Sequence, residues 1–196
     1  MCATYQLYSD EEENVKIQSI ISEVEKKYGE ETALKICSGD FFPKSMVPVE
    51  TQEDGIVLMR WGFPMFQSKQ VVFNAREVTL AEKPMFRKSL ISKRCLLPAS
   101  KFYEWDSGKK KLAIRPEDSG IFYIAGLYNE FTLLSGEKQT CVVMITTAPN
   151  SQMLPIHNRM PAILADNSIF DWMNAGEGLV PYAGDLWISP VTPVTQ

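Results

Sequence analysis

Apolar residues recur at helical spacing over one long stretch near the start of the chain. This periodicity predicts an amphipathic helix over about residues 10–28, with apolar positions at Ile17, Ile20, Ile21, Val24 and Tyr28. Ser9-Asp10-Glu11-Glu12 has the pattern of a capping box, and Gly29 stands where a C-terminal cap belongs. Two shorter helices are predicted over about residues 80–92, with Pro84 near the start, and 167–174, capped by Asp166 or Asn167.

The rest of the chain carries short apolar runs rich in β-branched and aromatic residues, a pattern typical of strands. Turn sequences such as Asp106-Ser107-Gly108 and Ser135-Gly136 separate these runs. Before them, Pro43 and Pro48 predict an irregular connection after the first helix. Strands are expected at Gly55–Trp61, Lys93–Leu97, Phe102–Trp105, Lys111–Arg115, Ile121–Tyr128, Cys141–Thr146, Arg159–Leu164 and Leu186–Ser189.

Strands do not alternate with long helices along this sequence, which argues against a doubly wound parallel sheet. The pattern instead predicts an α+β fold, with a mostly antiparallel β-sheet or open barrel and a few peripheral helices. The chain has 196 residues and shows no repeat, low-complexity stretch or obvious linker. We therefore expect one domain over residues 1–196.

Composition excludes several classes of protein. With 45% hydrophobic and 22% charged residues, the chain resembles an ordinary soluble globular protein. No apolar run is long enough to span a bilayer, and the start lacks the features of a secretion signal. We therefore expect a cytoplasmic protein, nucleoid-associated if bacterial, without a membrane partner. Four cysteines in a reducing compartment are expected to be free thiols, and one histidine without a Cys-x-x-Cys pair predicts neither a metal site nor a cofactor.

The net charge of −4 is unevenly distributed along the chain. Residues 1–55 hold 5 Lys and Arg against 12 Asp and Glu, whereas residues 60–115 hold 13 against 4. A middle segment with a net charge of +9 can present a basic face to a polyanion such as nucleic acid. An ordinary solvated lysine-rich surface is the alternative interpretation.

Cys2 has the most distinctive chemistry, because removal of Met1 would make it a terminal amino-thiol. A terminal α-amine has a pKa of about 8, against about 10.4 for lysine, so more of it is the nucleophilic free base at neutral pH. This amine condenses with an aldehyde to an imine, and the neighbouring thiol can then close a thiazolidine ring. The same terminus also suits an N-terminal-nucleophile hydrolase. An accidental cysteine is the third interpretation.

Two further residues suit proton transfer. His157 is the only histidine and lies in a proline-bounded loop beside Arg159, although a lone histidine is often structural. Glu104 lies within the aromatic strand Phe102–Trp105. If its side chain points outward, it is the polar member of an alternating strand. If it points inward, desolvation would raise the pKa of its carboxyl towards the range useful in acid–base catalysis.

Two motifs suit binding to nucleic acid. Asn74-Ala75-Arg76-Glu77 follows an apolar run, and asparagine can hold an amine while arginine can hold a phosphate bidentately. Trp61-Gly62-Phe63-Pro64 lies near basic residues. It suits stacking on an unpaired base, and it suits a place in the core equally well.

Together these motifs resemble the SOS-response-associated peptidase (SRAP) family of abasic-site processing proteins. They occur in the family's order over nearly the whole chain: Met1-Cys2, Trp61-Gly62 with Pro64, Asn74-Ala75-Arg76-Glu77, Arg94–Ala99, Phe102–Trp105, Ala125–Tyr128, Thr146-Thr147-Ala148 with Asn150, and His157–Pro161. The chain departs from the family at Ala3-Thr4, where Gly-Arg is usual, and so lacks an arginine expected to touch DNA.

The resemblance implies a DNA-repair enzyme that binds abasic sites in single-stranded DNA and cross-links to them covalently. It implies that Cys2 captures the ring-opened deoxyribose aldehyde as a thiazolidine and that Asn74 positions the Cys2 amine. It further implies that Glu104 orients the terminus and assists proton transfer, and that His157 assists ring opening and imine formation. An imine also permits β-elimination, hence a lyase activity, and the peptidase of the family name refers to N-terminal processing.

The resemblance also implies the residues that bind DNA. Arg76 and Arg159 would hold flanking phosphates, Trp61 would contribute to the DNA groove, and Pro43 would help to wedge the strand. Two other functions stay open: an N-terminal-nucleophile amidohydrolase, and a non-catalytic module that binds single-stranded DNA. The basic middle segment favours the DNA-binding functions, and Glu104 with His157 favours an enzyme.

Overall fold

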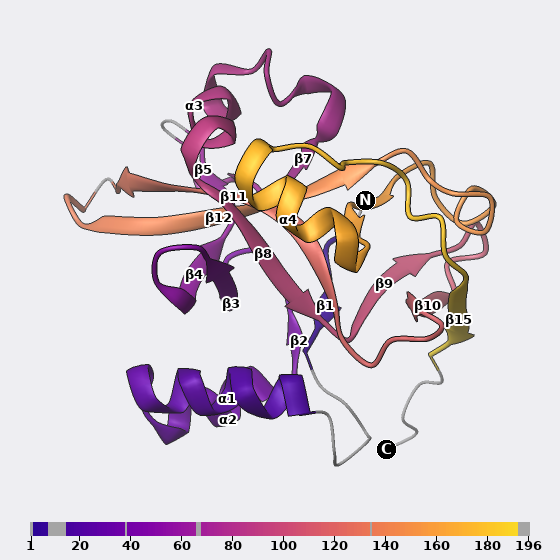
Figure 1. Ribbon diagram of the computed structural model, residues 1–196, viewed down its shortest axis with the longest axis horizontal. Coiled ribbons are helices and arrows are strands. Elements are labelled where there is room, and N and C mark those ends of the chain that lie inside the picture. The colour runs from indigo at the N-terminus through magenta and orange to yellow at the C-terminus, as the bar shows by residue number, and fades with distance from the viewer. Residues whose placement is uncertain (1, 8–14, 38, 66–67, 134, 192–196) are drawn as a thin grey trace.

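The computed structural model describes residues 2–7, 15–37, 39–65, 68–133 and 135–191 (Figure 1). It has an α+β architecture in which most strand pairs are antiparallel, which confirms the predicted fold class. Helices α1 (Val15–Tyr28) and α2 (Glu30–Cys37) lie together on one side, and α3 (Pro84–Ser92) and α4 (Asp166–Ala175) lie apart from them. No helix in the described part of the chain is long and apolar enough to cross a membrane.

Five strands of the largest sheet close into a barrel. They are β3 (Met46–Thr51), β4 (Gly55–Trp61), β8 (Arg94–Ala99), β11 (Phe122–Thr132) and β12 (Lys138–Thr147). The pairings run from β12 through β4, β3 and β8 to β11, and β11 pairs with β12 again. The β11–β12 hairpin extends well beyond the barrel (Figure 1).

Three short strands extend this sheet at its ends: β7 (Asn74–Arg76), β13 (Met160–Pro161) and β14 (Ile163–Leu164). Strand β7 pairs parallel to β12, with Arg76 opposite Thr146. Strand β13 pairs antiparallel to β12, with Pro161 opposite the same Thr146. The C-terminal end of β12 is therefore flanked by two chain segments, and each of them carries predicted site residues.

A second sheet ties down the beginning of the chain. Its strand order is β15 (Leu186–Pro190), β10 (Lys111–Pro116), β9 (Lys101–Trp105), β1 (Tyr5–Gln6) and β2 (Asp40–Phe41). Tyr5 lies opposite Phe102 of β9 on one side and Phe41 of β2 on the other. A third, two-stranded sheet joins β5 (Phe63–Pro64) to β6 (Val71–Val72). Because β1 pairs on both edges, residues 4–6 are held between β9 and β2.

All eight predicted strand regions contain strand, and one of them is interrupted. The region predicted over Arg159–Leu164 divides at Ala162 into β13 and β14. The Ala162 amide donates to the Ile145 carbonyl of β12 at 2.9 Å, whereas the Ala162 carbonyl accepts from the Ala125 amide of β11 at 3.0 Å. Ala162 thus changes partner strand, and the ladder breaks there.

The helices agree with the predicted faces but not with all the predicted limits. Ile17, Ile20 and Val24 of α1 are buried, and Gly29 ends the helix with φ of +87°, a conformation that favours glycine. The predicted capping box, Ser9–Glu12, lies outside the described residues. Helix α3 begins at Pro84 rather than near residue 80, because a 3₁₀ turn (Glu77–Thr79) comes first.

The irregular connection predicted from Pro43 and Pro48 is wrong at Pro48. Pro48 lies inside β3, opposite Leu58 of β4. The Leu58 amide donates to the Tyr28 hydroxyl at 3.1 Å and not to the Pro48 carbonyl, so this pair exchanges no ladder hydrogen bond. A residue without an N–H is tolerated where the ladder does not require a donor. Helix α2 was not predicted. It is short, and it buries Ala33 and Ile36.

The buried apolar side chains form two clusters on opposite faces of the barrel sheet. Along β12, Val142 and Met144 belong to the first cluster, whereas Cys141, Val143 and Ile145 belong to the second. Consecutive strand residues point to opposite faces, so the clusters lie on the two sides of the strand. The first cluster contains Cys2. Three cysteines are free thiols, as predicted, at Cys2, Cys95 and Cys141, and the side chain of Cys37 lies outside the described part.

Candidate functional site

Cys2 lies in a buried position against β9, with 1% of its surface exposed. Its Sγ donates a hydrogen bond to the Thr4 carbonyl at 3.4 Å. The same carbonyl accepts from the Tyr103 amide at 3.0 Å. Pairing of Tyr5 with Phe102 continues this attachment. The backbone around Cys2 is thus held by long-range hydrogen bonds before the first strand begins.

Asn74 contacts the backbone of Cys2 directly. Its Nδ2 donates to the Cys2 carbonyl at 2.7 Å. Its Oδ1 is buried and accepts no hydrogen bond from the described residues. Strand β7 places Asn74 opposite Met144 of β12. A buried amide oxygen without a donor, next to the Cys2 backbone, is suited to accept a hydrogen bond from a Cys2 amine.

Glu104 points inward, which is one of the two orientations that the sequence left open. Glu104 is 3% exposed. Phe102, two residues earlier on β9, is fully buried. Burial first, and the charge of Glu104 second, raise the pKa of the Cys2 thiol to about 12. The thiol is therefore protonated at neutral pH. A nucleophilic reaction at this terminus would begin with the amine, not with a thiolate.

Trp61 occupies the core, the position that the sequence left open beside a surface role. Its ring is fully buried, and its Nε1 donates to the Phe73 carbonyl at 2.9 Å. The ring packs edge-on against Tyr5 and Phe73, with centroid distances of 5.2 and 5.9 Å. Trp61 has no exposed face on which a base could stack, so its predicted contact with DNA is not supported. It instead fixes the backbone immediately before Asn74.

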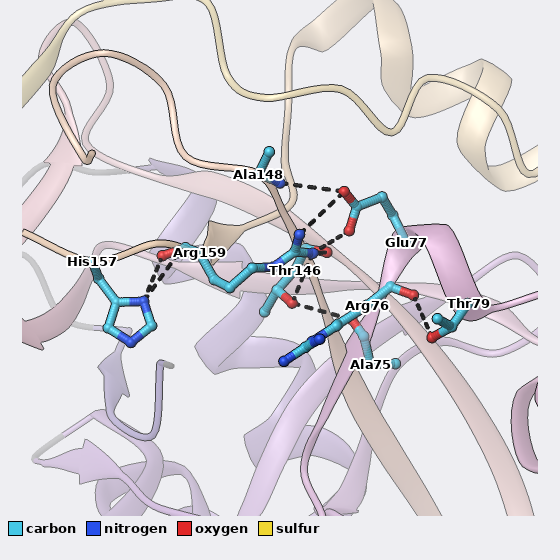
Figure 2. A network of polar contacts seen from close by, with 8 residues as sticks. All are labelled: Ala75, Arg76, Glu77, Thr79, Thr146, Ala148, His157 and Arg159. Atoms are coloured by element: carbon cyan, nitrogen blue, oxygen red, sulfur yellow. Dashed lines mark hydrogen bonds and ion pairs between the residues drawn. The ribbon is translucent and has the colours of Figure 1, made fainter.

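A network of polar contacts surrounds Arg159 (Figure 2). Its guanidinium forms an ion pair with Glu77 and also donates to the carbonyl and hydroxyl of Thr146. Glu77 Oε1 accepts in addition from the Ala148 amide at 3.2 Å. The side chains of Arg159 and Glu77 are 14% and 16% exposed, so this ion pair is largely shielded from water. The predicted phosphate ligand Arg159 therefore already has an anionic partner.

Arg76 differs from Arg159 in this respect. Its side chain is exposed and forms no hydrogen bond or ion pair with the described residues. Figure 2 shows the Arg76 guanidinium extending away from Glu77. Because Thr146 lies opposite both Arg76 and Pro161, the segments that carry Arg76 and Arg159 flank the same end of β12. Arg76 is the arginine of this pair that is open to an incoming anion.

His157 is half-buried, and its ring is oriented by the backbone of its own loop (Figure 2). Nδ1 lies 3.0 Å from the Arg159 amide nitrogen and 3.2 Å from the Arg159 carbonyl oxygen. An unprotonated Nδ1 can accept from the N–H, and a protonated one can donate to the carbonyl. The Arg159 backbone can thus orient the ring in either state. Pro43 is half-buried in the turn before β3, beside the exposed Phe42.

A hydrogen bond joins Cys2 to Asn74, and the charge of Glu104 acts on the Cys2 thiol. His157 contacts the Arg159 backbone, and no described contact joins this second group to Cys2. Glu77 and Thr146 received no role from the sequence. Glu77 directly follows Arg76 in a motif that was singled out, and this was the one signal for it. Thr146 belongs to the family motif Thr146-Thr147-Ala148, but only strand pairing places it beside Arg76 and Pro161. No group of three His, Cys, Asp or Glu side chains in the described part of the chain is arranged to hold a metal ion.

Comparisons with known proteins identify relatives of this chain. The chain is 41% identical over 125 residues to the abasic site processing protein YoqW of Bacillus subtilis (strain 168), a match that covers 59% of this chain and 56% of that protein. It is 29% identical over 178 residues to the abasic site processing protein HMCES of Xenopus tropicalis, covering 74% and 52%. The chain thus spans about half the length of the curated relatives it matches.

Solved structures share the fold. A crystal structure of a Bacteroides thetaiotaomicron protein superposes with a TM-score of 0.78 at 23% identity, covering 98% of this chain and 93% of that one. A Bordetella bronchiseptica protein gives 0.74 at 25% identity, covering 97% and 100%. The sequence model of the SOS response associated peptidase (SRAP) family matches residues 1–190. This protein therefore belongs to the SRAP family.

Proposed function

We propose that this protein binds abasic sites in single-stranded DNA and cross-links to them through Cys2, once removal of Met1 has made Cys2 the first residue. The observation that carries the proposal is the contact of buried Cys2 with Asn74, beside the charge of Glu104. The names of relatives such as YoqW and HMCES, abasic site processing proteins, support the choice of DNA lesion. The cross-link would shield the lesion during repair.

The reaction is an aldehyde condensation in two steps. The Cys2 α-amine adds to the C1′ aldehyde of the ring-opened sugar, and loss of one water gives an imine. The thiol then adds to the imine carbon: the C–S bond forms, the S–H proton passes to nitrogen, and a thiazolidine results. The protonated thiol of Cys2 suits this order, because the sulfur is needed only after the imine has formed. If the imine instead undergoes β-elimination, the DNA strand is cleaved, which would be a lyase activity.

One incubation distinguishes this proposal from its alternatives. The mature protein is mixed with single-stranded DNA that carries one abasic site, then heated and run on a denaturing gel. A heat-stable shifted band is the expected result. A non-catalytic binding module would shift DNA only on a native gel, and an N-terminal-nucleophile amidohydrolase would do neither while hydrolysing small amides. Absence of a heat-stable band with fully processed protein would contradict the proposal.

Glu104→Gln and His157→Ala are each expected to slow adduct formation by roughly 10²-fold to 10⁴-fold, because both residues are assigned to proton transfer. Rates are measured from single-turnover time courses of the gel-shifted band, with circular dichroism to check the fold. Glu117→Gln, at an exposed residue just after β10, is the matched control and should react at the native rate. Rates within twofold of native for both test variants would show that the two residues are structural.

Arg76→Gln is expected to flatten the dependence of log affinity on log salt concentration by about 0.7 for intact single-stranded DNA, the value for one phosphate contact. Arg159→Gln should flatten it less, because Glu77 already neutralises Arg159. Arg87→Gln, an exposed arginine on α3, serves as the control and should leave the slope unchanged. Fluorescence anisotropy over a salt series measures all three slopes. A larger change for Arg159→Gln than for Arg76→Gln would contradict this assignment.

A further inference from the structure

A pocket of about 710 Å³ lies away from Cys2, between the β5–β6 hairpin and the projecting end of the β11–β12 hairpin. Its volume falls in the range of sites that bind small organic molecules. Apolar side chains supply much of its wall, namely Pro64, Met65, Val71, Met85, Phe131 and Leu133. The ring of Phe131 packs on Phe63 at a centroid distance of 4.8 Å, which holds this aromatic wall in place.

The pocket and the Cys2 site lie on opposite faces of the barrel sheet. Trp61 packs with Cys2 in the first apolar cluster, whereas the preceding residue, Arg60, lines the pocket. On β12, the partner of Arg60 is Cys141, which also lines the pocket and belongs to the second cluster. Since neighbouring strand residues point to opposite sides, a molecule in this pocket would not touch Cys2.

Arg60 brings a positive charge to this pocket without a matching negative charge. Its Nη1 donates to the Gln139 side-chain oxygen at 3.1 Å. Its Nε is buried and donates to none of the described residues, and Arg60 takes part in none of their ion pairs. No acidic residue is among those that line the pocket, whereas Lys44 and Lys69 also line it. A half-buried guanidinium whose buried Nε has no acceptor is costly, and a bound anion would offset this cost.

We propose that this pocket binds a nucleotide. The phosphate would pair with Arg60 and with the lysines Lys44 and Lys69, and the base would lie against Phe131 and the methionine side chains. Basic groups beside an aromatic wall are the combination that proteins use for unpaired nucleotides, through phosphate pairing and stacking. The nucleotide comes either from a DNA strand on the protein or from free mononucleotide. This site does not depend on the chemistry proposed for Cys2.

The test measures binding of dTMP to the full chain by isothermal titration calorimetry. Removal of a charge-assisted hydrogen bond should weaken binding about tenfold or more, so Arg60→Met is expected to lose at least that much affinity. Thymidine, which lacks the phosphate, should bind more weakly by a similar factor. The matched control is Arg87→Met, an exposed arginine that does not line the pocket, and it should bind as the native chain does.

A second variant and a second ligand separate the remaining outcomes. If Arg60→Met melts at a lower temperature, Lys69→Met, an exposed lining residue, replaces it and should also weaken binding. Displacement of dTMP by an intact thymidine oligonucleotide, or binding of the oligonucleotide alone with the same dependence on Arg60, identifies a nucleotide of the strand. Binding of dTMP without displacement identifies the free nucleotide. If neither Arg60→Met nor Lys69→Met weakens the binding of dTMP or of the oligonucleotide, the proposal is overturned. Failure of the Cys2 chemistry cannot cause that result, because no abasic aldehyde is present in these titrations.

Discussion

Cys2→Ala is expected to abolish the heat-stable adduct with abasic single-stranded DNA and to retain most non-covalent binding. The variant keeps an α-amine and can form an imine, but it has no thiol to close the thiazolidine ring. The fold should persist, because the lost side chain is small and its S–H group is a weak donor to the Thr4 carbonyl. A denaturing gel after heating measures the adduct, and anisotropy with intact DNA measures the binding.

The matched variant Cys2→Ser separates the two steps of the reaction. A hydroxyl at the same position closes a weaker ring than a thiol, so at most an imine should accumulate. Borohydride treatment before heating should then convert that imine into a stable adduct, whereas untreated samples should show none. A full adduct yield from Cys2→Ala without borohydride would exclude the thiazolidine mechanism.

The predicted fold agrees with the structure where the chain carries runs of sufficient length. Strand β4 (Gly55–Trp61) was predicted with the limits that the structure shows, because an apolar run ends there at a glycine. Strands of two residues, such as β1 and β2, are too short to show any period. They form because they pair with distant strands, and this pairing also fixes Cys2.

The site shows the same division between local and long-range information. The orientation of Glu104 could not be derived from alternation, because Phe102, Tyr103 and Glu104 are all buried and β9 shows no alternation there. Trp61 gave an ambiguous signal for a different reason, since an aromatic residue suits both core and groove. The partner of Arg159 is Glu77, 82 residues earlier in the chain. No local pattern predicts that ion pair, and it is the feature that distinguishes Arg159 from Arg76.

The hydrogen bond between Asn74 and Cys2 depends on both local and long-range information. Both residues were selected from the sequence for their chemistry, and 72 residues separate them. Their contact depends on β7 pairing with β12 and on β1 pairing with β9, neither of which local propensity predicts. The chemistry of the site was therefore accessible from residue types, whereas its geometry required the sheet topology.

The central claim is that cross-linking requires a free α-amine on Cys2 itself. A peptide extension that ends in a protease site is placed directly before Cys2, so that the amine beside the thiol becomes an amide. The extended protein should bind intact DNA with the affinity of the mature protein, because Arg76 and the basic segment are unchanged. A Cys2→Ala version of the same extended chain is the control for effects of the cleavage itself.

The decisive measurement compares adduct formation before and after the protease removes the extension, with intact mass recorded at the end of each reaction. We expect no heat-stable adduct from the extended chain and full adduct formation once Cys2 is the first residue. The adduct yield should follow the processed fraction across a series of partial digests, and the Cys2→Ala control should stay inert throughout. If the extended chain, verified by mass as uncleaved after the reaction, cross-links as fast as the processed chain, the account of this terminus is contradicted.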